Sequence, residues 1–444
     1  MIKPTAKNKS VFSKTTNDFQ SERLSEGMKV GLINLGCARN LVDSQAILGN
    51  LKKKGHRIVD IAKADIAIVN TCSFIEDARK ESIDTILDLI ELKKQGKIKK
   101  VIVAGCLAQR YAKELADEFK EVDAFIGTPT LDREEVPDQV LLTPKHYAYV
   151  KICESCFNQC SFCAIPKIKG KFVSRSIESV VEEVKQLDKK GIKEILIIGQ
   201  DITAYGMDIY RQKSLAKLLK SIIPVTHNIE WIRLLYAFPA HVTDELIEVM
   251  AQEEKICKYI DMPLQHISDN ILLSMNRNIT TAQTHELLNK IRTYMPSGSL
   301  RTTFIVGMPG ETEENFKEMH DFIKKTRFDR MGVFVYSQEE GTAAFSMADQ
   351  VPETTKKKRL DVLMREQQKI SKEVQNKFLG QTLKVLIDEK SESEKNVFLG
   401  RSEFDAPEVD GIVYVHSSKE LKPGQFVTVK IIDSYEYDLV GEVV

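Results

Sequence analysis

Between residues 28 and 140 the chain alternates short apolar runs with amphipathic stretches. The apolar runs, which are typical of buried strands, are Lys29–Leu35, Ile66–Asn70 and Val101–Ala104. The stretches between them repeat apolar residues every three or four positions, as one face of a helix does. This spacing predicts helices over Leu41–Lys54, Ala78–Leu92 and Gln109–Lys120. Strands that alternate with helices indicate a doubly wound parallel sheet with helices on both faces.

The alternation continues in longer units over residues 141–352. The predicted strands are Tyr147–Ile152, Glu194–Ile198, Trp231–Leu235, Tyr259–Met262, Arg301–Val306 and Arg330–Tyr336. The predicted helices are Ile177–Lys190, Ser214–Ile223, Asp244–Ala251, Thr281–Tyr294 and Thr312–Lys325. Six such strands predict an incomplete (β/α)6 TIM-like barrel, in which the functional loops leave the carboxyl ends of the strands.

The last part of the chain changes its pattern. Glu353–Leu379 has one apolar stripe along a charged helix, which we interpret as a brace between domains over residues 353–380. Short alternating runs, broken by Gly and Pro, fill residues 381–444 and predict a small OB-like β-barrel. This module has 7 Lys or Arg against 13 Asp or Glu. A barrel that binds RNA backbone should be basic, so the charge favours a basic protein partner.

Composition bears on the setting of the protein more than on its fold. The 444 residues have a formal net charge of zero, so we expect no global attraction to nucleic acid or to a membrane surface. Residues 1–27 are polar and predict a disordered lead-in without a signal peptide or membrane helix. A cytoplasmic protein is therefore expected. In that reducing compartment, the eight cysteines favour metal ligands or reduced thiols over disulfides.

Four cysteines are concentrated just after the first strand of the predicted barrel: Cys153, Cys156, Cys160 and Cys163. Three thiolates on one loop, spaced CxxxCxxC, can hold three irons of a cubane cluster and leave the fourth iron open to a small molecule. A structural zinc site is the alternative. Zinc prefers two paired knuckles, and no second Cys or His pair lies close by, but Cys153 leaves a four-ligand site possible.

Three further cysteines stand in the loops LGCARN, NTCSF and AGCLAQR. Cys37, Cys72 and Cys106 each come one to three residues after a predicted strand. Because ligands bind outside the carboxyl ends of parallel strands, the three thiolates can converge on a second cluster. Taken singly, each would more often be a small buried hydrophobe. The repeated placement favours the cluster.

The CxxxCxxC loop that leaves the first strand of a βα barrel resembles that of the radical S-adenosylmethionine (SAM) superfamily. The upstream cysteines and the final β domain, of TRAM type, make the order of features similar to that of the methylthiotransferases. Within this family the chain resembles the branch that modifies a ribosomal protein, in the stretches LGCARNLVDS, NTCSFIEDARKESIDT, WIRLLYAFP, YIDMPLQHISD, YSQEEGTAA and DAPEVDGIVYV. The resemblance covers nearly the whole chain beyond the first 27 residues.

This resemblance implies that the cofactors are SAM and two [4Fe-4S] clusters. The cluster that reduces SAM would be held by Cys156, Cys160 and Cys163. The auxiliary cluster, which carries the sulfur, would be held by Cys37, Cys72 and Cys106. Loops after the barrel strands would bind SAM, with candidates Gly199, Gln200, Asp201, Gln265, His266, Gly307, Pro309, Gly310 and Glu311. Cys153 departs from the family pattern and is interpreted as a bystander thiol.

Two charged features are candidates for contacting a substrate carboxylate. Arg233, in the third predicted barrel strand, can do so bidentately, and the alternative is a buried ion pair that holds the barrel together. The basic run after the cluster loop, Lys167, Lys169, Lys171 and Arg175, can guide an acidic side chain by its charge. An ordinary solvated face is the more common origin of such a run.

The implied reaction adds a methylthio group to the β-carbon of an aspartate in the twelfth small-subunit ribosomal protein. By resemblance, SAM yields a 5′-deoxyadenosyl radical that removes hydrogen from this unactivated carbon, and a second SAM supplies the methyl group. The expected partners are that basic ribosomal protein and donors of sulfur and electrons, without a membrane and without tRNA. The alternatives are a tRNA methylthiotransferase acting on a modified adenosine, and an electron-transfer or zinc-binding scaffold.

Overall fold

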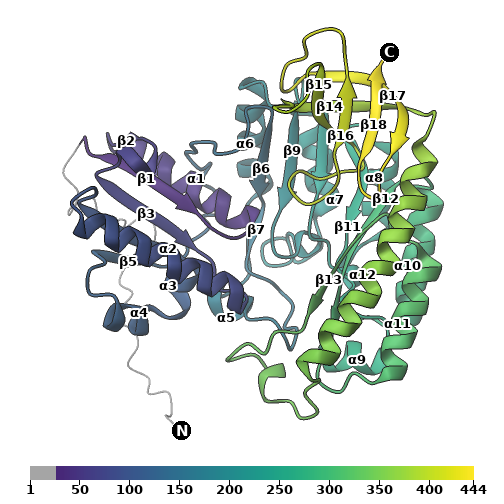
Figure 1. Cartoon of the computed structure of the whole chain (residues 1–444), viewed down its shortest axis with the longest axis horizontal. Helices are drawn as coiled ribbons and strands as arrows, with labels where there is room; N and C mark the ends of the chain where they lie inside the picture. Colours follow the sequence, from purple (N-terminus) through teal and green to yellow (C-terminus); the bar gives the residue numbers. More distant parts are fainter. Residues whose placement is uncertain (1–26) are drawn as a thin grey trace. The chain divides into compact units, whose positions relative to one another are not determined.

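The computed structural model describes residues 27–444, which form two compact units (Figure 1). The first unit holds the chain up to Leu142 together with Glu154–Cys156 and Ala164–Arg175. The second unit holds Thr143–Cys153, Phe157–Cys163 and Ser176–Val444. The predicted lead-in lies outside the described residues, apart from Gly27. The segment with the CxxxCxxC loop is thus shared between the two units.

The first unit is built on a parallel sheet with the strand order β2-β1-β3-β4-β5. Its strands are β1 (Lys29–Asn34), β2 (Arg57–Ile58), β3 (Ile66–Thr71), β4 (Lys100–Gly105) and β5 (Ala124–Ile126). Its main helices are α1 (Ala38–Lys53), α2 (Glu76–Lys94), α3 (Cys106–Arg110) and α4 (Ala112–Glu118). Along β3, Ile66 and Ile68 join one apolar core, whereas Ala67 and Val69 join the other. Both faces of the sheet are therefore buried, as predicted.

One helix of this unit differs from the prediction. In place of a single helix over Gln109–Lys120, α3 and α4 are separated at Tyr111, whose φ of −128° lies outside the helical range. The helix α3 begins directly after β4, and Gly105 between them has a φ of +93°. Glycine adopts this left-handed conformation without the steric cost that a side chain brings. The turn therefore puts Cys106 at the start of a helix.

The second unit contains a six-stranded parallel sheet with the order β13-β12-β11-β10-β9-β6. Its strands are β6 (Tyr147–Lys151), β9 (Glu194–Ile198), β10 (Trp231–Leu234), β11 (Ile256–Asp261), β12 (Ser299–Val306) and β13 (Arg330–Val335). Its helices include α6 (Ile177–Lys189), α7 (Leu215–Ile222), α8 (Asp244–Gln252), α9 (Asp269–Ser274), α10 (Thr281–Tyr294) and α11 (Glu313–Thr326). The two ends of the sheet are β6 and β13, so the predicted incomplete barrel is confirmed. β11 begins three residues before the predicted Tyr259, because Ile256 and Cys257 are also buried in the sheet.

The long helix α12 (Glu353–Gln375) packs against β13 and α11 and leads into a closed five-stranded barrel (Figure 1). The barrel strands are β14 (Thr382–Lys390), β15 (Val397–Ser402), β16 (Val413–His416), β17 (Phe426–Ser434) and β18 (Leu439–Val443). The alternating apolar residues of these strands form its core, which confirms the predicted small barrel. Within residues 27–444, no helix has the length and apolar character that crossing a membrane requires.

Buried ion pairs connect this barrel to the amino ends of the six-stranded sheet. The Nε of Arg330, the first residue of β13, donates to Asp405 at 3.0 Å. The Nη1 of Arg401 lies 2.7 Å from the carboxylate of Glu194, the first residue of β9. The side chains of all four residues are at most 6% exposed. Loss of one partner would leave a buried charge without compensation, so these pairs make the C-terminal barrel part of the second unit's structure.

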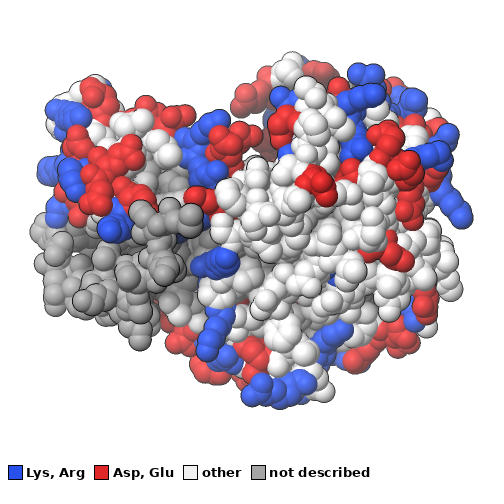
Figure 2. All heavy atoms as spheres, turned by 90° about the horizontal axis from the view of Figure 1, so that it is seen from below, with Lys and Arg blue, Asp and Glu red and all other residues white. Residues whose placement is uncertain are grey.

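Much of the acidic excess of the C-terminal module is directed into these contacts. Five of its acidic side chains contact residues of the six-stranded barrel region: Asp388, Glu403, Asp405, Glu408 and Asp410. Four of these five side chains are at least partly buried, whereas Glu408 is exposed, so the charge count alone does not give the acidity of the module's surface. Figure 2 shows the molecule from below the view of Figure 1, and on this face acidic and basic side chains are interspersed around a broad area without charged residues.

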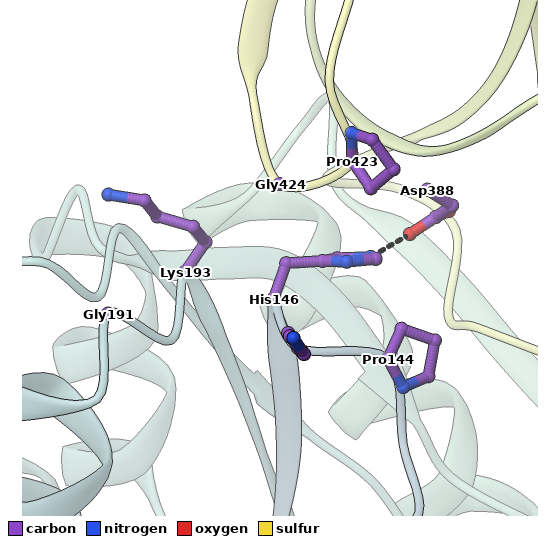
Figure 3. A pocket seen from close by; sticks show the side chains of 8 residues that line it. Pro144, His146, Gly191, Lys193, Asp388, Pro423 and Gly424 are labelled. Carbon is purple, nitrogen blue, oxygen red and sulfur yellow. Dashed lines mark hydrogen bonds and ion pairs between the residues drawn. The ribbon is translucent and has the colours of Figure 1, made fainter.

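A cavity of about 400 Å³ lies where the C-terminal barrel meets the amino ends of β6 and β9 (Figure 3). Its lining includes Pro144, Lys145, His146, Lys193, Asp388 and Gly424. Both oxygens of Asp388 are already used, since one lies 2.7 Å from Nε2 of His146 and the other accepts from Arg401 at 2.8 Å. The side chain of Lys193 points away from this pair (Figure 3). The cavity is at the amino end of β6, whereas the cysteine loop follows the carboxyl end.

Candidate functional site

The three upstream cysteines lie at the carboxyl ends of neighbouring strands. Cys37 precedes α1 after β1, Cys72 follows β3 directly, and Cys106 begins α3 after β4. In the sheet β3 lies between β1 and β4, so the three loops emerge side by side. A β-carbon built on Gly36 would lie only 3.1 Å from the Sγ of Cys72. The structure therefore brings these loops together at one edge of the sheet.

Asn40, in the first turn of α1, connects all three loops, and the sequence analysis missed it. Its Nδ2 donates to the carbonyls of Leu35 at 3.0 Å and Thr71 at 3.2 Å, which precede the first two cysteines. Its Oδ1 accepts a hydrogen bond from the thiol of Cys106 at 3.8 Å. The side chain is buried. The motif LGCARN contains this residue, but only the fold reveals that it spans three separate strands.

The three thiols of this set have different environments. Burial would raise the pKa of Cys37, but Arg39, whose Nε donates to its Sγ at 3.4 Å, lowers the pKa below its usual value. Burial raises the pKa of Cys72 and raises that of Cys106 to about 12. Iron binds the thiolate, so binding of a cluster would release the protons of these thiols. Cys37 is therefore the thiol of this set that ionises most readily.

The second cysteine loop runs from β7 (Cys153–Glu154) to α5 (Ile165–Lys169). Three of its cysteines are partly exposed, as the ligands of an accessible cluster must be: Cys156, Cys160 and Cys163. Cys153 is different, because it is fully buried and a β-carbon on Gly199 would lie 2.4 Å from its Sγ. Its thiol also donates to the carbonyl of Asp201 at 3.6 Å. Cys153 therefore packs against the loop after β9, which agrees with its interpretation as a bystander.

Asp201 is a buried junction rather than a free carboxylate. Its Oδ1 accepts from the N–H groups of Thr203 at 3.0 Å and Ala204 at 3.2 Å. Its Oδ2 accepts from Nδ2 of Asn158 at 2.8 Å and lies 2.7 Å from Nδ1 of His241. Asn158 stands inside the CxxxCxxC spacing, and the sequence analysis missed it. Asp201 therefore helps to orient the cluster loop.

The predicted turn after β12 is organised by Glu311, whose side chain is fully buried. One carboxylate oxygen pairs with Arg359 at 2.6 Å, and the other accepts from the N–H of Gly307 at 2.9 Å. The second oxygen also lies 3.6 Å from Nε2 of His266, which is itself buried. Gly307 has a φ of +78°, and a β-carbon there would lie 2.2 Å from the side chain of Lys356. Glu311 and His266 thus support the turn from inside.

Gln265 and Gly310 are two predicted positions that have features of a ligand site. Gln265 has a φ of +72°, and main-chain hydrogen bonds to Thr303 and Ile305 hold it in this strained conformation. Its buried Oε1 has no hydrogen-bond partner among the described residues. At Gly310, with a φ of +80°, the space for a side chain is open. An unpaired buried acceptor and backbone strain are features of functional sites, and both lie on loops after barrel strands.

Arg233, the candidate for contacting substrate, is used inside the protein. It is fully buried, and its Nε donates to Glu194 at 2.7 Å. Its Nη1 donates to the carbonyl of Glu403 at 2.7 Å. The structure therefore contains the alternative, a buried ion pair that holds the barrel together, in place of a substrate contact.

Two members of the basic run after the cluster loop, Lys169 and Arg175, are buried. The Nζ of Lys169 lies 3.0 Å from Asp43 and 3.3 Å from Glu154, and all three side chains are almost fully buried. Burial would lower the pKa of Lys169, but the two carboxylates raise it above its usual value, so the amine stays charged. Lys167 and Lys171 are exposed. A solvated face therefore describes only part of the run, because Lys169 links α1 to both ends of the cluster loop.

Comparison with known proteins agrees with this arrangement. The Radical SAM superfamily matches residues 150–323, the TRAM domain matches 379–444, and the uncharacterized protein family UPF0004 matches 29–127. Ribosomal protein uS12 methylthiotransferase RimO of Caldanaerobacter subterraneus is 48% identical over 93% of this chain and 99% of its own length. The enzyme of that name from Clostridioides difficile is 44% identical, over 94% of this chain and 99% of its own length. This chain belongs to the RimO family.

Solved radical SAM enzymes share the fold of the RimO-family chain. The methyltransferase TsrM from Kitasatospora setae, with cobalamin and a [4Fe-4S] cluster bound, has a TM-score of 0.53 at 16% identity, over 70% of this chain and 75% of that chain. The cobalamin-dependent SAM radical enzyme OxsB has a TM-score of 0.51 at 13% identity, over 78% of this chain and 56% of that chain. At these identities the likeness concerns the fold alone.

Membership of the RimO family makes the chain a SAM-dependent methylthiotransferase whose cofactors are SAM and two [4Fe-4S] clusters. The residues fit these groups. Each cysteine set offers three thiols, and Gly36 comes within contact of Cys72, where a side chain would crowd the edge that a cluster needs. Among residues 27–444, His, Cys, Asp and Glu side chains form no group of three around a single metal ion.

Proposed function

We propose that this enzyme adds a methylthio group to the β-carbon of an aspartate in ribosomal protein uS12. The observation that carries the proposal is the convergence of Cys37, Cys72 and Cys106 at one sheet edge, in a chain that also has the CxxxCxxC loop. Relatives named for methylthiotransfer to uS12 are 44% to 48% identical over almost their whole length, which supports the substrate.

In this proposal each set of three cysteines holds one cluster. The SAM-cleaving cluster is held by Cys156, Cys160 and Cys163, and the auxiliary cluster by Cys37, Cys72 and Cys106. When bound, these groups supply radical formation from SAM and a sulfur atom for transfer. The chain's own residues supply orientation: Asp201 and Asn158 hold the cluster loop, and the unpaired Oε1 of Gln265 can accept a hydrogen bond from SAM. Gly199 and Gln200 on the loop after β9, and Pro309 and Gly310 on the loop after β12, complete the proposed SAM site.

Basic uS12 would dock on exposed acids that the internal pairs leave unused. Three exposed acids lie close together here: Glu389 near the end of β14, and Glu392 and Glu394 in the turn between β14 and β15. Charge of this kind mainly speeds and orients the encounter, so we expect weak, salt-sensitive binding. The proposal also requires proteins that donate sulfur and electrons. Because the substrate is ribosomal, we expect the enzyme to act in the cytoplasm.

The test is the intact mass of uS12 from cells with and without this gene. We expect the mass of one methylthio group to disappear on deletion and to return with the native gene. A gene carrying Cys160→Ala should not restore it, since that set would lose one iron ligand. An unchanged uS12 together with loss of a methylthio group from tRNA would instead support the tRNA enzyme and overturn the proposal.

A further inference from the structure

The turn that follows α9 holds the middle of the CxxxCxxC loop. The N–H of Ser161 donates to the carbonyl of Met275 at 2.9 Å, and Nδ2 of Asn276 donates to the carbonyl of Gln159 at 2.7 Å. Cys160 lies between these two anchored residues. Asn276 has a φ of +54°, in the left-handed region that Asn tolerates better than most residues. This turn therefore fixes the backbone on both sides of one predicted iron ligand.

The next residue, Arg277, directs its guanidinium at the sulfur of that ligand. Its Nη1 donates to the Sγ of Cys160 at 3.9 Å, and its Nη2 donates to the carbonyl of Pro263 at 2.6 Å. The guanidinium carbon lies 4.3 Å from the centre of the Phe238 ring. The side chain is only 6% exposed. The carbonyl and the ring hold the guanidinium from two directions, so its approach to the sulfur is fixed by the fold.

We propose that Arg277 raises the reduction potential of the cluster held by the CxxxCxxC loop. This inference rests on the cluster assignment in the proposed function. Reduction adds one negative charge, and both a hydrogen bond to a ligand sulfur and a nearby cation stabilise the reduced form. Because Arg277 is nearly shielded from water, salt screens its charge much less than it screens a surface charge. Arg277 therefore acts through Cys160, as a residue that positions the loop and tunes the cluster.

The other cysteine set contains a related contact. Arg39 donates from Nε to the Sγ of Cys37 at 3.4 Å. In each set, one cysteine thus accepts a hydrogen bond from an arginine. Arg39 comes from the loop of its own cysteine, whereas Arg277 lies 117 positions from Cys160. The long-range contact depends on the fold, so its effect can be removed without changing the cluster loop itself.

The test is a potentiometric titration followed by electron paramagnetic resonance. The full-length chain would carry Cys37→Ala, Cys72→Ala and Cys106→Ala, so that one reconstituted cluster contributes the signal. With Arg277→Gln we expect the ratio of reduced to oxidised cluster at a fixed potential to fall about tenfold, a shift of about 59 mV for one electron. The matched control is Arg292→Gln on α10, where the side chain donates to the carbonyl of Gly298 at 2.6 Å and to Asp329. This control should keep the parent potential.

A parent potential in Arg277→Gln with full iron content would overturn the inference. If that variant does not retain iron, the same titration is made on Arg277→Lys. One ammonium group cannot reproduce the two hydrogen bonds that the guanidinium donates to the Pro263 carbonyl and the Cys160 sulfur. We expect a lower potential there as well, and a parent value would contradict us. Iron loss in both variants would also overturn the inference, since Arg277 would then hold the loop without tuning it. Failure of the proposed function appears elsewhere, as an unchanged uS12 mass, and leaves this shift measurable.

Discussion

At the scale of single residues, several side chains close to the predicted ligands support loops instead of facing a ligand. Asn40 joins three cysteine loops, and Asp201 joins the cluster loop to the turn after β9. Cys153 has the residue type of a ligand, yet its sulfur fills the space beside Gly199. A ligand is therefore distinguished from a support by what its atoms contact. Residue type alone does not make that distinction.

The contact between Cys153 and Gly199 gives a prediction about packing. Gly199→Ala would place a β-carbon 2.4 Å from the sulfur, so we expect the free energy of unfolding to fall by about 1–3 kcal/mol. In Cys153→Ala/Gly199→Ala the sulfur is absent, and the combined loss should be smaller than the sum of the single losses. Urea denaturation of all three variants measures this coupling. Gly332→Ala is the control, because its β-carbon would meet nothing closer than 3.8 Å, and additive losses would refute the packing role.

At the scale of elements, the helix α5 is tied to α1 although the two are far apart in sequence. Lys169 joins Asp43 of α1, 126 positions away, to Glu154 at the start of the cluster loop. Ile168 and Ala164 of the same segment pack with Cys106 of α3. The segment after the CxxxCxxC loop therefore belongs to the core of the first unit, and its buried Lys169 pairs with two buried carboxylates.

Replacing this cation should destabilise the first unit. In Lys169→Met the buried Asp43 and Glu154 lose this cation, and we expect a loss of about 3–5 kcal/mol in the free energy of unfolding. Hydrogen exchange read separately on α1 and on the six-stranded sheet locates the effect, which should be concentrated in α1. Lys171→Met, at an exposed position, should change stability by less than about 0.5 kcal/mol. Equal protection of α1 in both variants would show that the ion pairs contribute little.

At the scale of the whole molecule, the C-terminal barrel acts as a structural part of the second unit. Its acidic loop after β15 reaches arginines of the six-stranded sheet, including Arg330 and Arg301. Asp405 and Asp410 are buried or nearly so in these pairs. A module that the sequence describes as a separate small barrel therefore shares buried charges with its neighbour. Its folding and that of the sheet should be coupled.

This coupling can be tested with one buried acid. Asp405→Ala leaves Arg330 buried without its carboxylate, and we expect the second unit to lose about 3–5 kcal/mol of stability. Hydrogen exchange should then increase in β13 as well as in the C-terminal barrel. Glu392→Ala removes an exposed acid of the same module and should leave both unchanged. An effect of Asp405→Ala confined to the C-terminal barrel would mean that the two parts fold independently.

Sequence patterns predicted helices and strands best where the buried residues follow one another within a short segment of the chain. The longer strands of both parallel sheets contain apolar runs, because these sheets are covered on both faces, and the runs were identified with errors of a few residues at their ends. The short strands β2 and β5 were missed, since two or three residues do not form a recognisable run. The break at Tyr111 was missed because apolar spacing continues through it. Cysteines were recognisable by their chemistry and by their place after strands. The supporting residues were missed because their partners lie far away in sequence.

The predictions for charged residues failed for the same reason, because their partners lie far away in sequence. Arg233 and Lys169 appeared as candidates for substrate contact because a charge in sequence carries no information about its partner. In the structure Glu194 and Asp43 are those partners, and both pairs are buried. Likewise, the count of acids in residues 381–444 is correct, but it does not distinguish an exposed carboxylate from one that neutralises a buried arginine.

Periodicity along the chain was therefore sufficient for the fold class, and residue chemistry singled out two sets of three cysteines, because both signals depend on spacing within short segments. Folding decides which charged and polar groups meet. Arg277 reaches Cys160 and Asp201 reaches Asn158 only because loops after different strands converge at one end of the sheet. Such contacts are set by topology, and they determine which residues hold the cluster loop and which remain available to SAM.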